Sequence, residues 1–116
     1  MYVYNISDRS HPVLVNDFNH SAMIREFREY FWHGFQYLVG FLQYKKGAYW
    51  TADLGLWNIS SGNTTHPDFV CQINTLEADG TFTSDAFDMH DGYAFAMRKN
   101  RNTSTYDGIS VYSVKD

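Results

Sequence analysis

Carboxylate and imidazole side chains gather in one short run of the chain, Asp85–Gly92 (DAFDMHDG). Both groups are ligands of divalent metal ions, so this run is the first place to look for a metal site. An EF-hand loop would need a central Gly and a closing Glu, and the run has neither in place. On a strand, Asp88 and His90 would share one face while Asp91 begins a turn, so at most two ligands converge. We therefore favour a solvated strand end and predict no metal.

The sequence contains no recognisable motif for nucleophilic catalysis or for nucleotide binding. The five His residues are scattered singly, and none stands in a Ser/His/Asp or HExxH context. The single Cys, Cys71, lies in the apolar stretch FVCQI, where a buried inert thiol is the usual outcome. The glycines form neither GxGxxG nor GxxxxGK[ST]. We expect no cofactor and no enzymatic activity.

Charge is distributed unevenly along the chain. Between Lys46 and Arg98 there are seven Asp and Glu residues and no Lys or Arg, whereas the remaining residues carry a surplus of basic charge. Such asymmetry creates a face of negative potential that suits a basic partner. Acidic residues in turns are also ordinary solvated caps, and this alternative stays open. The candidate partner-binding carboxylates are Asp53, Asp79, Asp85, Asp88 and Asp91.

Aromatic residues are unusually abundant, with nine Tyr, nine Phe and three Trp. Tyr and Trp are enriched at protein interfaces because they offer a large apolar area with a polar tip. On a strand from residue 48 to 58, Tyr49, Asp53 and Trp57 would share one face and Trp50 the other. One Trp is therefore expected in the core and one outside. We take Tyr49 and Trp57 as candidate partner contacts, with packing of both Trp residues as the alternative.

Length and composition limit the class of protein. A chain of 116 residues normally folds around one core, so we expect a single domain spanning residues 1–116. The net charge of -4 argues against direct nucleic-acid binding, which needs surplus Lys and Arg. The longest apolar run, Tyr30–Tyr44, contains polar residues and is too short for a membrane span. The start of the chain shows no signal-peptide pattern, and a cytoplasmic location is expected.

Helical spacing predicts two helices in the first half of the chain. In residues 21–32, Met23, Ile24, Phe27 and Phe31 follow the spacing of one helical stripe, with charged residues opposite. Gly34 then provides a stop. Residues 35–46 also fit a helical face, although a buried strand is the alternative.

β-type residues and Gly-containing turns dominate the second half. Strands are predicted over residues 48–58, 69–76, 81–89, 93–98 and 109–114, with residues 2–6 as a further edge. The expected turn pairs are Gly62-Asn63, Asp79-Gly80, Asp91-Gly92 and Asp107-Gly108. The predicted fold class is therefore α+β, with two N-terminal helices packed on one face of a mostly antiparallel sheet of about five strands.

The segment Phe27–Asn58 resembles the opening of a family of small bacterial and phage domains. Members of that family show a strand that begins Gly-Ala-Tyr-Trp with an Asp three residues after the Trp. The matching residues here are Gly47, Ala48, Tyr49, Trp50 and Asp53. A second, fainter likeness is to the antirestriction proteins of plasmids, through GAYW and the segment Leu76–Phe87. The first resemblance implies a role in the biology of mobile elements, with no established activity.

These patterns lead to a functional hypothesis. The chain is expected to be a phage or mobile-element protein that binds a host protein through an acidic and aromatic surface and inhibits it, as an anti-defence inhibitor. A nuclease with a basic surface is the natural target. The alternative is a small enzyme or ligand-binding domain with a pocket between helices and sheet that uses Asp53, Asp88 and His90. The oligomeric state stays open, with a homo-oligomer as one outcome.

Overall fold

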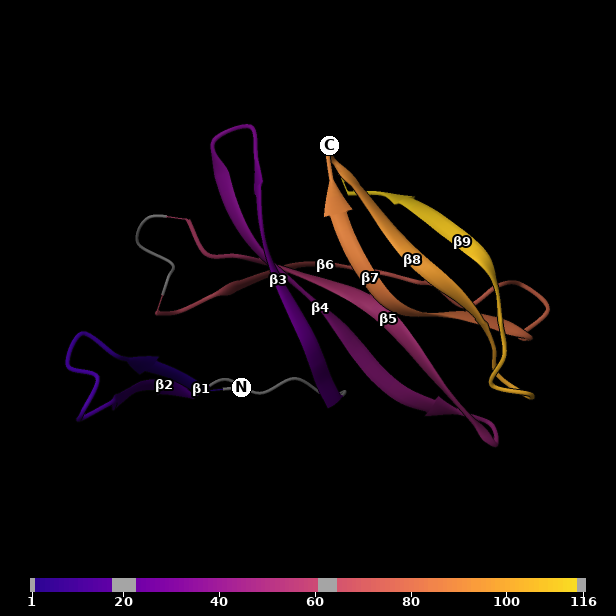
Figure 1. Ribbon diagram of the computed structural model, residues 1–116, viewed down its shortest axis with the longest axis horizontal. Coiled ribbons are helices and arrows are strands. Elements are labelled where there is room, and N and C mark those ends of the chain that lie inside the picture. The colour runs from indigo at the N-terminus through magenta and orange to yellow at the C-terminus, as the bar shows by residue number, and fades with distance from the viewer. Residues whose placement is uncertain (1, 18–22, 61–64, 115–116) are drawn as a thin grey trace.

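The computed structural model describes residues 2–17, 23–60 and 65–114, and these residues form strands and connections without a helix. The predicted α+β class with two N-terminal helices is therefore wrong, because the domain is all-β in its described part (Figure 1). The nine strands are β1 (Tyr2–Asn5), β2 (Val13–Asp17), β3 (Met23–Trp32), β4 (Phe35–Lys46), β5 (Tyr49–Asn58), β6 (Asp68–Ile73), β7 (Phe82–His90), β8 (Tyr93–Asn100) and β9 (Tyr106–Ser113). They form three antiparallel sheets, ordered β1-β2, β3-β4-β5-β6 and β7-β8-β9.

A β-bulge explains why β3 reads as a helix in the sequence. The register with β4 shifts between Arg25 and Phe27, and the extra residue, Glu26, has a φ of 53°. Residues on one face of a strand normally recur every second position, and a bulge inserts one more. Ile24 and Phe27 therefore share a face although they are three residues apart, as Arg25 and Arg28 do on the other face. That spacing imitates the period of a helix.

Strand β4 does not alternate between apolar and polar residues, for a different reason. It lies between β3 and β5 in the four-stranded sheet, and apolar side chains are buried on both of its faces. Val39 and Phe41 point one way and Leu42 the other, and all three are at most 1% exposed. A strand covered on both faces is a continuous apolar run, which periodicity alone does not distinguish from a buried helix.

Two-residue turns join three of the strand pairs. His33-Gly34 and Asp91-Gly92 both have positive φ at both positions, which is the type I′ turn that matches the twist of a hairpin. Gly47 alone has positive φ in the β4–β5 turn, as a type II′ turn requires. Gly34 therefore closes a hairpin and does not end a helix.

The strands predicted for the second half of the chain are confirmed, with bounds that differ by at most three residues. Asp91-Gly92 forms a hairpin turn as expected, Asp79-Gly80 lies in the longer β6–β7 connection, and Asp107-Gly108 lies within β9. The Gly62-Asn63 pair is outside the described residues. The N-terminal strand exists as β1, but it pairs with β2 in a separate sheet and is not an edge of a larger one.

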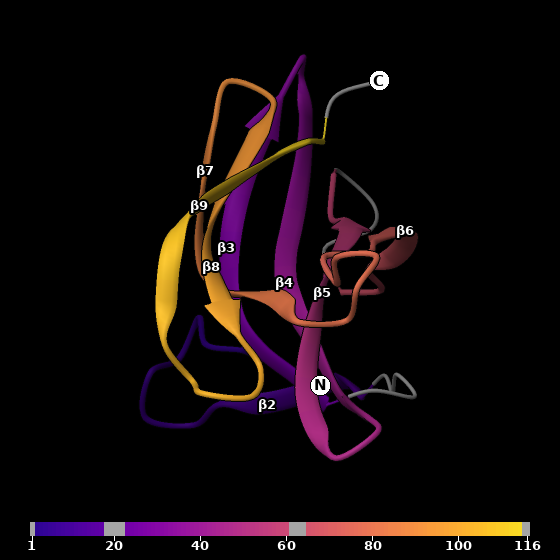
Figure 2. The same ribbon diagram turned by 90° about the vertical axis from the view of Figure 1, so that its right-hand side faces the viewer.

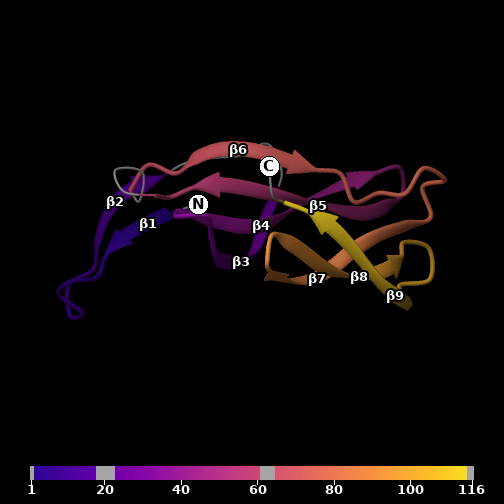
Figure 3. The ribbon, with the colours of Figure 1, turned by 90° about the horizontal axis from the view of Figure 1, so that it is seen from above.

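The core lies between the four-stranded sheet and β7–β9, which are layered in Figures 2 and 3. Phe41 of β4 meets Phe87 of β7 edge to face, with ring centroids 4.9 Å apart. Ala94 and Ala96 of β8 are at most 1% exposed, and their small side chains let the two sheets approach closely. Leu54 and Leu56 of β5 belong to the same buried cluster.

The β1–β2 hairpin extends to one side of this sandwich (Figure 1). Its apolar side chains are largely exposed, among them Tyr2, Tyr4, Val13 and Leu14. The radius of gyration is 15.5 Å, whereas a compact domain of this length would have about 13 Å. The described residues include no helix long and apolar enough to cross a membrane.

Candidate functional site

The predicted partner-binding residues do not form one surface. Tyr49 is 44% exposed beside the β4–β5 turn, whereas Asp91 lies in the β7–β8 turn at the other end of the sheets (Figure 1). Asp79 is exposed in the β6–β7 connection, and Asp88 is exposed on β7. The other three members of the predicted set, Asp53, Trp57 and Asp85, are buried or paired within the chain.

Asp53 is 3% exposed, and its carboxylate accepts hydrogen bonds in the interior of the protein. Its Oδ2 accepts hydrogen bonds from the Tyr44 hydroxyl at 3.0 Å and from Gln72 Nε2 at 2.6 Å, and its Oδ1 accepts one from the Thr75 amide at 3.2 Å. Burial and the neighbouring carboxylate raise the pKa of Tyr44. Asp53 is therefore a structural acceptor that joins β4, β5 and the segment after β6, and it is not available to a partner.

Threonine hydroxyls continue the hydrogen bonding of β5 where β6 ends. Thr83 Oγ1 accepts a hydrogen bond from the Ala52 amide at 3.2 Å, and the Thr75 hydroxyl donates to the Ala52 carbonyl. Thr51 and Thr83 hydroxyls are 2.6 Å apart, and all three Thr side chains are at most 4% exposed. Buried backbone groups need such partners, and these hydroxyls fix the start of β7 against β5.

Asp85 is at the centre of a charged cluster between the two sheets. Its carboxylate lies 3.3 Å from an Arg25 guanidinium nitrogen and 3.6 Å from Lys99 Nζ, and it accepts a 2.7 Å hydrogen bond from the Tyr106 hydroxyl. Burial opposes ionisation of Asp85, but the Tyr106 hydrogen bond, Lys99 and Arg25 outweigh it, and the pKa of Asp85 is lowered. The negative charge of Asp85 is thus compensated within the chain.

We expect stability to depend on the charge of Asp85 at acid pH. Because its pKa is lower in the folded state than its ordinary value of 3.8, ionised Asp85 stabilises the fold above that value, and the stabilisation is lost as the pH falls through the folded pKa. The midpoint of thermal unfolding should fall as the pH decreases from about 5 to about 2, and it should fall less in Asp85→Asn. If the unfolding midpoints of the wild type and Asp85→Asn changed equally with pH, the charge of Asp85 would not stabilise the fold.

The small basic cluster near the end of β8 is also engaged within the chain. Arg98 forms a two-pronged ion pair with Glu77 at 2.5 and 2.9 Å, which lowers the pKa of Glu77, and its guanidinium lies 3.4 Å from the Phe82 ring centroid. Arg101 donates to four backbone carbonyls, those of Lys46, Tyr49, Trp50 and Gly80. These contacts join the β4–β5 turn to the three-stranded sheet.

A small pocket, open to solvent, lies beside the charged cluster around Asp85. Its lining includes the charged residues Arg25, Asp85 and Lys99 together with Trp50 of β5. The expected pocket between helices and sheet does not exist, because the described chain has no helix, and its residues Asp53, Asp88 and His90 do not line this one. Arg25 was not foreseen as a pocket residue, since the helical interpretation placed it on a solvent face.

The outer face of β8 and β9 is an exposed apolar surface that the sequence did not predict. Phe95 pairs with Val111, and Met97 pairs with Ile109, so the four side chains are neighbours on one face. Their exposed fractions are 40%, 55%, 42% and 69%, respectively. The signal was present in the sequence YAFAM, where small Ala residues alternate with large apolar ones. Hydrophobic patterning normally places the large residues inside, whereas here the Ala residues face the core.

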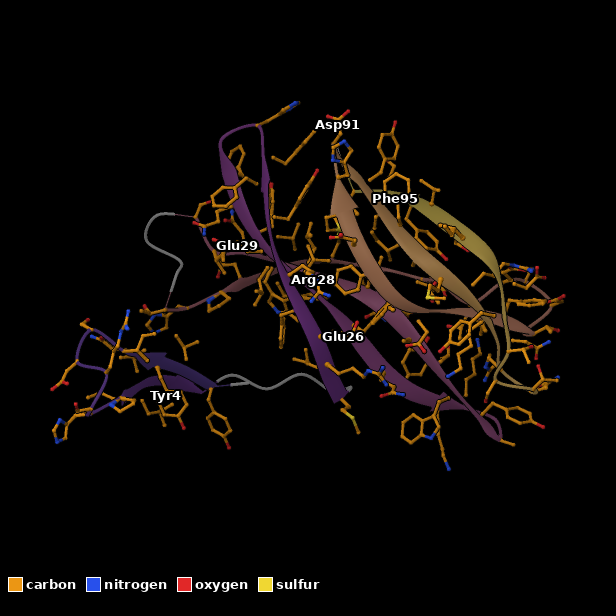
Figure 4. All side chains as sticks on the ribbon, viewed as in Figure 1. Tyr4, Glu26, Arg28, Glu29, Asp91 and Phe95 are labelled. Carbon is orange, nitrogen blue, oxygen red and sulfur yellow. The ribbon has the colours of Figure 1, made fainter. Side chains whose placement is uncertain are left out.

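Acidic side chains border this apolar face. Asp88 is the cross-strand partner of Phe95 on β7 and is exposed. Asp91 follows in the adjoining turn, and Figure 4 shows it at the same end of the sheet as Phe95. Strand β9 pairs only with β8 in the described chain, so the apolar face also adjoins a sheet edge. We call Phe95, Met97, Ile109 and Val111 the β8–β9 face.

Comparisons with known proteins yield no match to a protein-family model, a curated protein or a solved structure. The resemblance of Phe27–Asn58 to a family of bacterial and phage domains therefore stays a prediction. Among residues 2–17, 23–60 and 65–114, no three His, Cys, Asp or Glu side chains come together as a set of metal ligands.

Proposed function

We propose that this chain is a non-enzymatic binding protein that docks on another protein through the β8–β9 face. The observation that carries the proposal is the contiguous row of exposed apolar side chains, two on each of two paired strands. Large contiguous apolar patches are uncommon on soluble monomers, and such patches mark interaction sites. The adjoining edge of β9 adds backbone groups that a lone domain would normally protect.

The border of the face specifies the chemistry of the partner. Asp88 and Asp91 are exposed next to the apolar side chains, and an apolar centre with a charged rim is the usual anatomy of a protein interface. The complementary surface is an apolar patch with Lys or Arg at its edge. The resemblance of Phe27–Asn58 to domains of phages and mobile elements supports a host defence protein, such as a nuclease with a basic surface, as the class to test first.

The test compares matched variants in affinity capture from host lysate. Phe95→Ser combined with Ile109→Ser should abolish retention of a partner that the wild type binds, because central apolar contacts carry most of the binding energy. Phe31→Ser is the control, since Phe31 is 65% exposed but lies on β3. Equal retention by the double variant, or equal loss with Phe31→Ser, would contradict the proposal. Sedimentation of the purified protein tests whether the partner is a second copy.

The acidic border gives a second measurement on the same complex. Asp88→Asn and Asp91→Asn should lower the association rate and weaken its salt dependence, because exposed charges act mainly on diffusional encounter. Asp85→Asn is not part of this test, since Asp85 is already paired with Arg25 and Lys99. Unchanged association rates at low salt would leave the apolar side chains as the sole determinant and remove the basic rim from the description of the partner.

A further inference from the structure

The pocket beside Asp85 contains more cationic groups than its carboxylate can neutralise. Arg25 and Lys99 share the single carboxylate of Asp85, which leaves a formal surplus of one positive charge at the wall of the pocket. A localised cation at a partly buried site favours the binding of an anion.

The hydrogen-bond donors of the two cations are also incompletely used. The Arg25 guanidinium donates to Gln43 Oε1 and Asp85 Oδ1, both at 3.3 Å, which is longer than the usual charge-assisted bond. Lys99 Nζ lies 3.6 Å from Asp85 Oδ2, beyond ordinary hydrogen-bond distance. Guanidinium and ammonium groups have five and three N–H donors, respectively. A carboxylate or phosphate group between Arg25 and Lys99 would find donors from both.

The lining also includes an aromatic side chain. Trp50 lines the pocket and is 47% exposed, with Lys45 Nζ 5.6 Å from its ring centroid, so the rest of the indole offers a flat apolar surface to a ligand. The buried hydroxyls of Thr51 and Thr83 bond to each other at 2.6 Å in the adjoining wall.

We propose that this pocket binds a small organic anion, a carboxylate or phosphate attached to a flat apolar ring, with the anionic group between Arg25 and Lys99 and the ring on Trp50. The site adjoins the β8–β9 face, because Asp85 is the cross-strand partner of Met97, but Arg25, Lys99 and Trp50 are not members of that face. A variant that no longer binds the ligand can therefore still be tested for binding of the protein partner, and a variant that no longer binds the partner can still be tested for the ligand.

The test follows chemical shifts of the intact protein by NMR during titration with phenyl phosphate, benzoate and inorganic phosphate. Phenyl phosphate and benzoate should give saturable shifts of the Trp50 indole and of Lys99. Inorganic phosphate should bind several-fold more weakly, because it lacks the ring. Absence of saturation at about 10 mM phenyl phosphate would overturn the proposal. Equal affinity for inorganic and phenyl phosphate would overturn the assignment of Trp50.

Variants distinguish a binding role from a structural one. Lys99→Gln and Arg25→Gln should each weaken phenyl phosphate binding about tenfold, the value of one charge-assisted contact. Asp85→Asn should instead tighten binding, because it removes the competing negative charge while the two cations stay. Arg9→Gln, in the exposed β1–β2 connection, is the matched charge control. Weaker binding in Asp85→Asn, or equal loss in Arg9→Gln, would contradict the proposed site.

Discussion

Truncation of Trp57 to alanine should lower the free energy of unfolding by about 3–5 kcal/mol, as expected for a large aromatic side chain removed from a core. Trp57 is 2% exposed and lies over Gly55 in the same strand, where a Cβ atom would come within 2.7 Å of the indole. Phe27 and Phe69 lie beside it, with ring centroids at 6.2 and 5.5 Å. The loss would be a large share of the 5–15 kcal/mol that typically stabilises a domain.

Trp50→Ala is the matched control for this prediction. Trp50 is on the same strand but is 47% exposed, so its truncation should change stability by less than about 1 kcal/mol. Chemical denaturation followed by circular dichroism measures both variants with one wild-type reference. Similar losses for the two Trp residues would show that burial does not separate them, and would also contradict the description of the face of β5 that carries Gly55.

The second half of the fold was predictable from sequence because its turn residues and its strand composition indicate the same structure. Asp91-Gly92 provides the positive φ values of a hairpin turn, and the strands on either side have β-type composition. The prediction of helices in the first half was wrong because a bulge changes the period of β3 and because β4 is covered on both faces. Glu26 has a positive φ although it is not Gly, so the residue type at this position does not indicate a bulge in a single sequence.

The site was less predictable than the strands, because its residues are far apart in the chain. The sequence shows that residues 47–97 contain seven carboxylates and no Lys or Arg. Composition does not show that Arg25, from another sheet, compensates Asp85, nor that Asp53 is buried. Of the predicted carboxylates, Asp79, Asp88 and Asp91 stay exposed. Pairing across a sandwich depends on how the sheets pack, and local patterns carry no information on it.

Replacing Asp53 by alanine should cost about 3 kcal/mol or more of unfolding free energy, since each buried donor left without an acceptor costs about 1–3 kcal/mol. Three donors depend on this carboxylate, the Tyr44 hydroxyl, Gln72 Nε2 and the Thr75 amide. Solvent reaches Gln72, which is exposed, so the largest part of the loss should come from Tyr44 and Thr75. Chemical denaturation measures the difference from wild type.

Asp53→Asn separates the hydrogen bonds from the charge. Asparagine keeps the shape and one acceptor oxygen, so it can still accept from the Thr75 amide, and it should cost less than the alanine variant. It also removes the negative charge that, after burial, raises the pKa of Tyr44. The Tyr44 pKa, followed by NMR, should therefore move down toward 10.0 in Asp53→Asn. An unchanged Tyr44 pKa together with wild-type stability of the alanine variant would show that Asp53 does not organise the interior, and would return it to the candidates for partner binding.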